Sequence, residues 1–572
     1  MVLPGAECAL GQAGATANSA EQGALLAGQA ALKRSDIPRA RTEFEKAVQL
    51  APNDAQAQAA LGWVLAQMGD ADGAVSHLTA AIKLKPGFAD PRLALASVLA
   101  QLGKAAEAEQ EAREAVKIAP RNAEAHRTLA KILSRGSAQE EALAEMRKAA
   151  ELVPERADLE DNLGTLLAQR NQLADAEAAF KKAIKLQPDL ESAHFHLGAV
   201  YLQENHPEDA ALELTKAIDL APQDGSAHYY LAKTLAAQSR NAEALLELRK
   251  AAALKADWFE LQIELGIAAQ RAGDIDGAVG AFKEAVKLRP DDAEAYNDLG
   301  LALVQKGDAA GSIPEFRKAV ELRPQDGTLR GSLAIAFLQR ADFDAAVTEL
   351  EAAIKLAPDN ASLRYNLGLA YKLKDQLDKA VVEFQNAIAL QPDLADAHYT
   401  LGVLFWQRGE FDQATEELRK AIQSQPGYAE AHYTLGTVLK QQGKLPEAAA
   451  ELREAIRLQP DFAGAHTTLA AVLRQTGDAA GAAEEARTGA RIAASTNNLQ
   501  AATFATNSGK RLLTAGDVEG AVAQFRSAIG SEPAYAAAHY QLGLALRQRG
   551  NKDEAQKEFQ RAMELDPQLT AP

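Results

Sequence analysis

Apolar residues along this chain recur in two stripes within successive units of 34 residues. In each unit, positions 4, 7, 8 and 11 share one face of a helix, and positions 20, 24, 27 and 30 share one face of a second helix. Position 7 is Leu in fourteen of sixteen units, and position 27 is Ala in fifteen. Two amphipathic helices separated by a short turn predict a helical hairpin as the repeating element.

Prolines mark the end of each unit. Position 32 is Pro in fourteen units, while Ala256 and Ala494 take this position in the other two. Proline stops the second helix, because it has no backbone N–H to donate. The units begin at Glu21, Ala55, Ala89, Ala123, Ala157, Glu191, Gly225, Phe259, Ala293, Gly327, Ala361, Ala395, Ala429, Ala463, Ala502 and Ala536.

Small residues predict how the two helices meet. Position 8 is Gly or Ala in all sixteen units, and position 20 is Ala in all but one, where Ser312 stands. A larger side chain there would hold the helices apart. Position 15 is Gly in nine units and Asn at Asn171 and Asn205, which indicates a left-handed residue just past the first helix.

Leu-Gly, a paired Ala, a large apolar residue, a further Ala and Pro at these offsets resemble the tetratricopeptide-repeat (TPR) pattern. The resemblance covers Glu21 to Leu569. It implies an all-α solenoid of about sixteen 34-residue hairpins, stacked into a right-handed superhelix whose concave groove is lined by the first helices. A single hairpin cannot bury both stripes, so each must stack on its neighbours.

The rhythm divides the chain into five segments. We expect a loosely ordered leader at 1–20, a fourteen-repeat TPR array at 21–494, an insertion at 495–501, two C-terminal TPRs at 502–569 and a tail at 570–572. Around the insertion, Gly489 replaces Ala, Ala494 replaces Pro, and polar residues follow. We interpret it as a joint between two arrays, with a bulge as an equal alternative because loop insertions cost little. At Ala256, where proline is also missing, the helix end is expected to differ.

Composition favours helical structure and limits the classes of binding partner. Apolar residues make up 47% and aromatic residues 5% of the 572-residue chain. The net charge of −17 makes nucleic acid and anionic membranes poor general partners. No apolar run is long enough to span a membrane, and Cys8, the single cysteine, excludes an intramolecular disulfide. The compartment stays open: cytoplasmic by default, and periplasmic or secreted if a signal peptide has already been removed.

The TPR resemblance also implies where partners bind. In the family, positions 2, 5, 9, 12 and 13 of the first helix face the groove. Carried over to this sequence, these offsets give a candidate peptide-binding set in the C-terminal half: Tyr365, Lys372, Tyr399, Trp406, Gln407, Tyr433, Lys440, Gln441, Arg474 and Gln475. Aromatic and cationic residues in a concavity suit an extended or helical, acidic segment of another protein.

A structural interpretation competes with this one. Position 2 is often acidic and position 12 becomes basic, which helix dipoles favour without any ligand. The carboxylate clamp by which some TPR domains bind chaperone tails is rejected. Arg127, Lys131 and Asn162 match it in part, but Ser192 and His196 do not.

Seven histidines recur at position 4: His126, His194, His228, His398, His432, His466 and His539. Equivalent positions on neighbouring first helices lie too far apart to share one zinc ion, so we expect packing and no metal. The motifs HExxH, GxxxxGK and GxSxG are all missing, so we expect no enzyme activity and no cofactor.

The sequence therefore predicts a non-enzymatic scaffold for protein–protein interaction. The alternative is a self-assembling structural subunit that stacks end to end through its terminal repeats, because no further capping helix follows the last hairpin. RNA binding by a related helical-repeat code is a weaker third reading, given the acidic balance.

Overall fold

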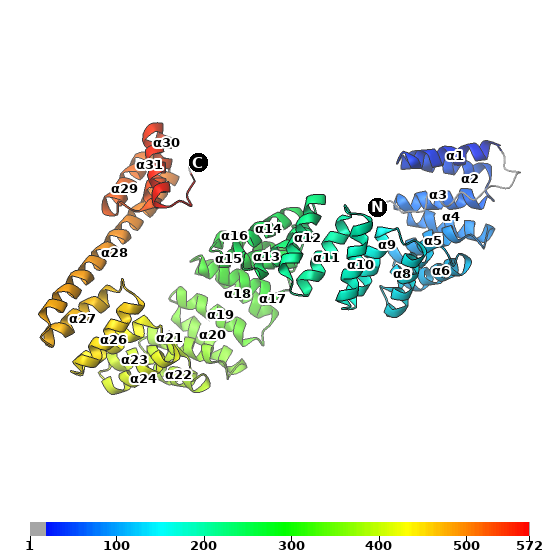
Figure 1. Cartoon of the computed structure of the whole chain (residues 1–572). Helices are drawn as coiled ribbons and strands as arrows, with labels where there is room; N and C mark the ends of the chain where they lie inside the picture. Colours follow the sequence, from blue (N-terminus) through cyan, green and yellow to red (C-terminus); the bar gives the residue numbers. More distant parts are fainter. Residues whose placement is uncertain (1–18, 571–572) are drawn as a thin grey trace. The chain divides into compact units, whose positions relative to one another are not determined.

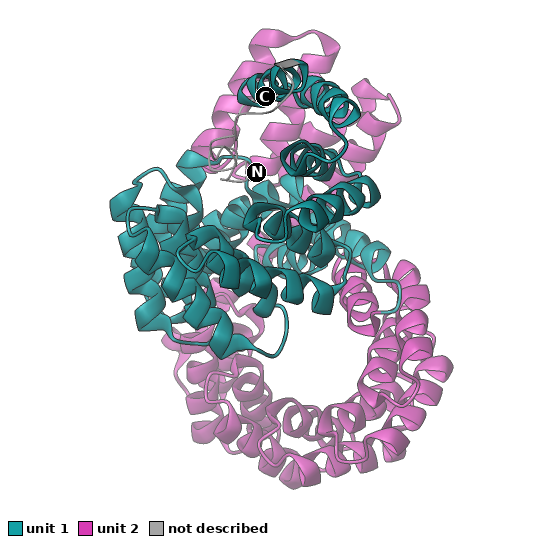
Figure 2. Ribbon diagram, turned by 90° about the vertical axis from the view of Figure 1, so that its right-hand side faces the viewer, with its two compact units in different colours: residues 1–291 teal, residues 292–572 magenta. Residues whose placement is uncertain are grey.

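The computed structural model describes residues 19–570, which form helices and their connections with no strand. The chain divides into two compact units, residues 1–291 and 292–572, coloured separately in Figure 2. Residues 1–18, most of the expected leader, lie outside the described part of the chain, and Cys8 with them. The first helix begins at Ser19, two residues before the first unit of the sequence pattern.

Unit 1 contains eight hairpins (Figure 1). Its helices are α1 (Ser19–Lys33), α2 (Ile37–Leu50), α3 (Ala55–Gln67), α4 (Ala71–Leu84), α5 (Ala89–Gln101), α6 (Ala105–Ile118), α7 (Ala123–Leu133), α8 (Gln139–Leu152), α9 (Ala157–Gln169), α10 (Leu173–Leu186), α11 (Glu191–Gln203), α12 (Pro207–Leu220), α13 (Gly225–Ala237), α14 (Asn241–Leu254), α15 (Phe259–Arg271) and α16 (Ile275–Leu288).

Unit 2 holds the other eight repeats in fifteen helices, because two of them share one long helix. They are α17 (Ala293–Gln305), α18 (Ala309–Leu322), α19 (Gly327–Gln339), α20 (Phe343–Leu356), α21 (Ala361–Leu373), α22 (Leu377–Leu390), α23 (Ala395–Gln407), α24 (Phe411–Ser424), α25 (Ala429–Gln441), α26 (Leu445–Leu458), α27 (Ala463–Gln475), α28 (Ala479–Thr514), α29 (Val518–Ser531), α30 (Ala536–Arg549) and α31 (Lys552–Leu565).

The turn between the two helices of a repeat follows the expected chemistry. All nine glycines at position 15 have positive φ, as do Asn171 and Asn205. Position 15 is also left-handed at Ser35, Ser239, Ala341 and Asp375, which the sequence did not indicate. Where Asp comes next, as at Asp70, its carboxylate accepts a backbone N–H of the following helix (Gly73 N to Asp70 Oδ1, 2.9 Å). A left-handed residue at position 15 thus recurs in fifteen of the sixteen described hairpins, and an Asp cap follows it in seven of them.

The core runs between the helices and continues from repeat to repeat. The largest cluster, from Ala334 to Ala482, combines leucines of first helices with alanines, Phe384 and leucines of second helices. Apart from the weakest contacts, each helix within a unit packs against the next helix or the one after it. This nearest-neighbour packing is that of an all-α solenoid, which confirms the expected fold class.

The two positions that lack the stop proline behave differently. Before Ala256, α14 ends at Leu254, the same position 30 at which the other second helices end, so the expectation of a different helix end was wrong. After Ile492, by contrast, α28 continues without a break to Thr514. Residues 495–501 are therefore helical and join the second helix of repeat 14 to the first helix of repeat 15. Whether they act as a joint between arrays stays a prediction.

Candidate functional site

The three candidate tyrosines lie at position 5 of consecutive first helices, α21, α23 and α25. All are half-buried and pack against the core of unit 2. The ring centroid of Tyr399 lies 4.9 Å from that of Tyr428, and Tyr433 lies 4.7 Å from Phe462. Burial raises the pKa of Tyr365. The tyrosines are thus part of the packing between repeats.

Tyr428 and Phe462 were not among the candidate residues. Each is the N-cap residue just before a first helix, and the Tyr428 hydroxyl donates to Asp396 Oδ1 at 3.1 Å. Burial, followed by the charge of Asp396, raises the pKa of Tyr428 far above its usual range. The signal available in the sequence was an aromatic residue at position 34, where six other repeats carry Asp or Asn.

Trp406 links two consecutive repeats directly. Its indole Nε1 donates to Gln441 Oε1 at 2.7 Å, which connects position 12 of α23 with position 13 of α25. The ring is half-buried, while Gln407, Gln441 and Gln475 are exposed. Position 12 of α23 and position 13 of α25 therefore lie side by side. We call positions 12 and 13 of α21, α23, α25 and α27 the candidate surface.

The cations of the candidate surface are half-buried at Lys372 and Lys440 and exposed at Arg474. Lys372, Lys440 and Arg474 form no ion pair with any residue in the part of the chain that the structure describes. Each lies in the last turn of its helix, as the dipole interpretation also requires.

Cations at position 14, two residues after position 12, do form ion pairs. A cation at position 14 pairs with a carboxylate at position 18 of the preceding repeat, in a ladder that joins neighbouring hairpins. The pairs are Arg170–Glu140, Lys374–Asp344, Arg408–Asp378 and Arg549–Glu519. Cations near the ends of these first helices are therefore not unpaired in general, because those at position 14 have carboxylate partners.

In unit 1 the same face is occupied by internal bonds. Asp161 on α9 accepts a hydrogen bond from the Ser192 hydroxyl (2.9 Å) and one from His196 Nδ1 (2.8 Å), both on α11. Arg127 pairs with Glu124 on its own helix. Arg127, Ser192 and His196 thus bind carboxylates of the chain itself, which is a physical reason for rejecting that role.

The position-4 histidines are buried and bridge the two helices of a repeat. In all seven, Nδ1 lies within 2.5–2.6 Å of a glutamate nineteen residues on, and Nε2 lies 3.0–3.3 Å from the carbonyl of the preceding proline. These bonds account for both ring nitrogens. No group of three or more potential ligands within residues 19–570 is arranged to hold a metal ion.

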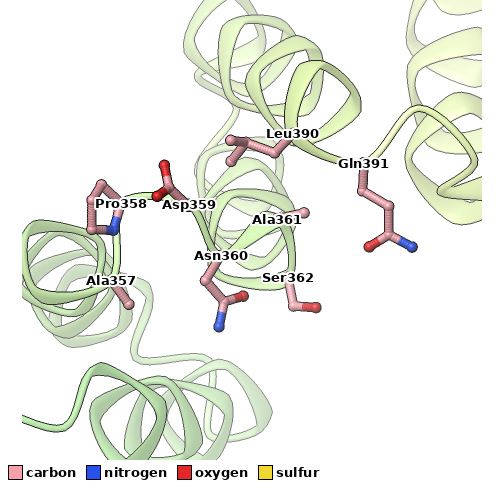
Figure 3. Close-up of a pocket in the computed structure, with 8 residues that line it drawn as sticks. All are labelled: Ala357, Pro358, Asp359, Asn360, Ala361, Ser362, Leu390 and Gln391. Carbon is pink, nitrogen blue, oxygen red and sulfur yellow. The ribbon is translucent and has the colours of Figure 1, made fainter.

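A hollow of about 590 Å³ opens at the connection between α20 and α21 (Figure 3). Its lining comes from residues 357–362, together with Leu390 and Gln391 at the end of α22. Asn360 is tied down there, because its side chain accepts from the backbone N–H of Leu363 at 3.2 Å. None of the ten candidate residues lines this hollow, so it is separate from the candidate surface.

Family models identify the chain. Three models of tetratricopeptide repeats match it, at residues 25–89, 197–259, 263–327 and 506–569, at 65–132 and 405–461, and at 164–205, 334–375 and 370–409. The chain belongs to the tetratricopeptide-repeat family. The function that this family match supports is a protein-interaction scaffold, and no catalytic family is indicated. No helix in the described range has the length and apolarity needed to cross a membrane.

Comparison with solved structures also found similar chains. A chain in the crystal structure of the APC/C hetero-tetramer Cut9–Hcn1 is 16% identical to this chain. The match covers 80% of this chain and 97% of the other, with a TM-score of 0.36. YrrB, described as a TPR protein with an unusual peptide-binding site, is 26% identical over 32% and 94%, with a TM-score of 0.30. PilF of Pseudomonas aeruginosa is 23% identical over 36% and 94%, with a TM-score of 0.34. No curated protein matches the chain in sequence. Family membership therefore rests on the repeat models.

Proposed function

We propose that this protein is a non-enzymatic scaffold that binds an acidic, extended or helical segment of a partner protein along the candidate surface of unit 2. The observation that carries the proposal is the line of three cations without carboxylate partners, next to the Trp406–Gln441 bridge. In a chain of net charge −17, a local cationic line selects acidic segments by charge complementarity. The aromatic edge of Trp406 supplies the apolar anchor that peptide hot spots need.

Charge reversal tests the proposal. Fluorescence anisotropy would measure the binding of a set of acidic peptides. The same peptides with Asp and Glu replaced by Asn and Gln serve as uncharged copies. The variant Lys372→Glu/Lys440→Glu/Arg474→Glu should weaken binding of acidic peptides at least about tenfold, equivalent to roughly 1.4 kcal/mol, and reduce its salt dependence. The amide copies should bind weakly to wild type and variant alike.

A matched control keeps the change in net charge. Lys355→Glu/Arg453→Glu/Arg487→Glu reverses three exposed cations on second helices of the same unit. This control should bind like wild type. Equal loss of binding in both triple variants would assign the effect to overall charge and contradict the proposed surface.

A further inference from the structure

The long helix α28 leaves one aromatic side chain exposed at a position that is elsewhere buried. Phe504, at position 3 of repeat 15, is 72% exposed. Position 3 is buried in all the other repeats that follow a repeat, for example Leu261 (0%), Leu363 (4%) and Ala465 (0%). In repeat 1, the first that the structure describes, Gly23 at position 3 is exposed. Position 3 is thus the residue by which a repeat docks on its predecessor.

The docking partner of position 3 is the alanine at position 27 of the preceding repeat. The two share a core cluster in several places, as in Ala47–Ala57, Ala115–Ala125, Ala183–Ala193, Ala319–Leu329 and Ala528–Ala538. For Phe504 the equivalent partner is Gly489. Phe504 is the only aromatic residue at position 3, and Gly489 is the only position 27 without a Cβ. The largest side chain at position 3 therefore corresponds to the smallest residue at position 27.

In α28 these two residues cannot meet. Fifteen residues of continuous helix hold them about 22 Å apart along the axis. Repeat 14 therefore lacks the neighbour that would cover its C-terminal side, and repeat 15 lacks the neighbour that would cover Phe504. Gly489 is buried against α27 of its own repeat, while Phe504 is exposed. These two sides are the two halves of the interface seen between other repeats.

The helix between these faces has an unusual surface. Residues 494–501 are all exposed, and no charged residue occurs from Ile492 to Gly509, although charged residues make up 24% of the chain. Ser, Thr, Asn and Ala side chains allow a second helix to approach closely, and Leu499 adds an exposed apolar contact. An exposed, uncharged helix of this length fits a partner helix with the same surface.

We propose that a second copy of this chain covers both faces by exchange of the C-terminal repeats. In the dimer, repeats 15 and 16 of each copy dock on repeat 14 of the other, with Phe504 against the other copy's Gly489. The two α28 helices cross antiparallel at 494–501. The contact is isologous and closed, so assembly stops at two chains, unlike end-to-end stacking through terminal repeats.

Light scattering coupled to size exclusion is the first test. The wild type should elute with the mass of two 60.8 kDa chains. Phe504→Asp should raise the dissociation constant at least about a hundredfold, because each dimer loses two buried aromatic anchors. Leu212→Asp on α12, where the leucine is 68% exposed, is the matched control and should remain dimeric. A monomeric wild type, a dimeric Phe504→Asp or a mass that keeps growing with concentration would overturn the exchange.

Disulfide trapping tells exchange from docking within one chain. In a Cys8→Ser background, a chain with Gly489→Cys is mixed with a chain with Phe504→Cys, and both are oxidised together after dissociation and reassembly. Exchange predicts a disulfide-linked pair of different chains. If mixing gives no linked pair, while one chain carrying both cysteines closes on itself, repeat 15 docks in cis and the proposal is wrong.

Discussion

At the residue scale, His398 shows how one side chain ties a repeat together. Its Nδ1 lies 2.6 Å from Glu417 Oε2 and its Nε2 lies 3.0 Å from the Pro392 carbonyl. Both neighbours are acceptors, so the protonated ring can donate from both nitrogens. Burial lowers the pKa of His398, but the bonds to Glu417 and Pro392 outweigh it and raise the pKa above 6.5. Burial likewise raises the pKa of Glu417, but hydrogen bonds from His398 and Lys420 prevail and hold it below 4.5.

The sign of the pH dependence follows from these shifts. The contribution of His398 is complete below its unfolded pKa and is lost as pH rises through the raised folded value, while that of Glu417 is lost as pH falls through its lowered value. The pair therefore stabilises most between about pH 4.5 and 6.5. His398→Gln, which keeps the bond to proline seen at Gln58, should cost about 1–2 kcal/mol at pH 6 and less at pH 9. Thermal melts at both pH values check this, and equal costs would contradict it.

At the element scale, one pair of positions sets how closely the two helices of a repeat approach. Every Phe at position 24 faces Gly at position 8, whereas Ala at position 8 faces Leu, Met or Ala. In α17, a Cβ on Gly300 would lie 2.5 Å from Cε1 of the fully buried Phe316. The large Phe side chain of the second helix therefore packs where the first helix has a glycine and no side chain.

This match predicts a compensated pair of substitutions. Gly300→Ala should destabilise the hairpin by about 1–3 kcal/mol through overpacking. Adding Phe316→Leu should recover part of the loss, because Ala334 and Leu350 form such a pair naturally. Hydrogen exchange of the α17 and α18 amides gives the local free energy of opening, and Phe316→Leu alone completes the cycle. If the stability losses of the two single variants simply add in the double variant, the contact between positions 300 and 316 is not the cause of the destabilisation.

At the scale of the whole molecule, stability is local because packing is local. Within each unit, the main contacts join helices that are neighbours in the chain or one further apart. The boundary between the units falls between Asp291 and Asp292, whereas the sequence had suggested a break only near 495–501. A solenoid of this kind has no central core that both halves must complete.

Separate halves should therefore fold. Residues 1–291 and 292–572, expressed alone, are expected to be helical by circular dichroism and to melt in a sigmoidal transition. Each half keeps the nearest-neighbour packing inside its own unit, so the melting temperature should fall by a few degrees rather than collapse. A half that is unfolded at 25 °C would show that cooperativity extends across the cut.

The candidate surface was only partly predictable. The offsets brought by the TPR resemblance gave Trp406 and its neighbour Gln441, which the structure joins by a hydrogen bond. They also gave Tyr399 and Tyr433, but not the rings of Tyr428 and Phe462 that pack against them from the next connection. A repeat pattern fixes which face a residue occupies, but not which side chain of the neighbouring repeat reaches it.

The sequence by itself determined the hairpins, because helix periodicity, left-handed turn residues and terminal prolines act within a few residues of one another. The helix ends near Ala256 and Ala494 were decided only by the tertiary structure. At Ala256 the usual four-residue connection keeps the next hairpin in place without proline, so α14 still ends at Leu254. After Ala494, five additional residues allow the helix to continue. A missing stop signal permits both outcomes, and packing against the next repeat selects between them.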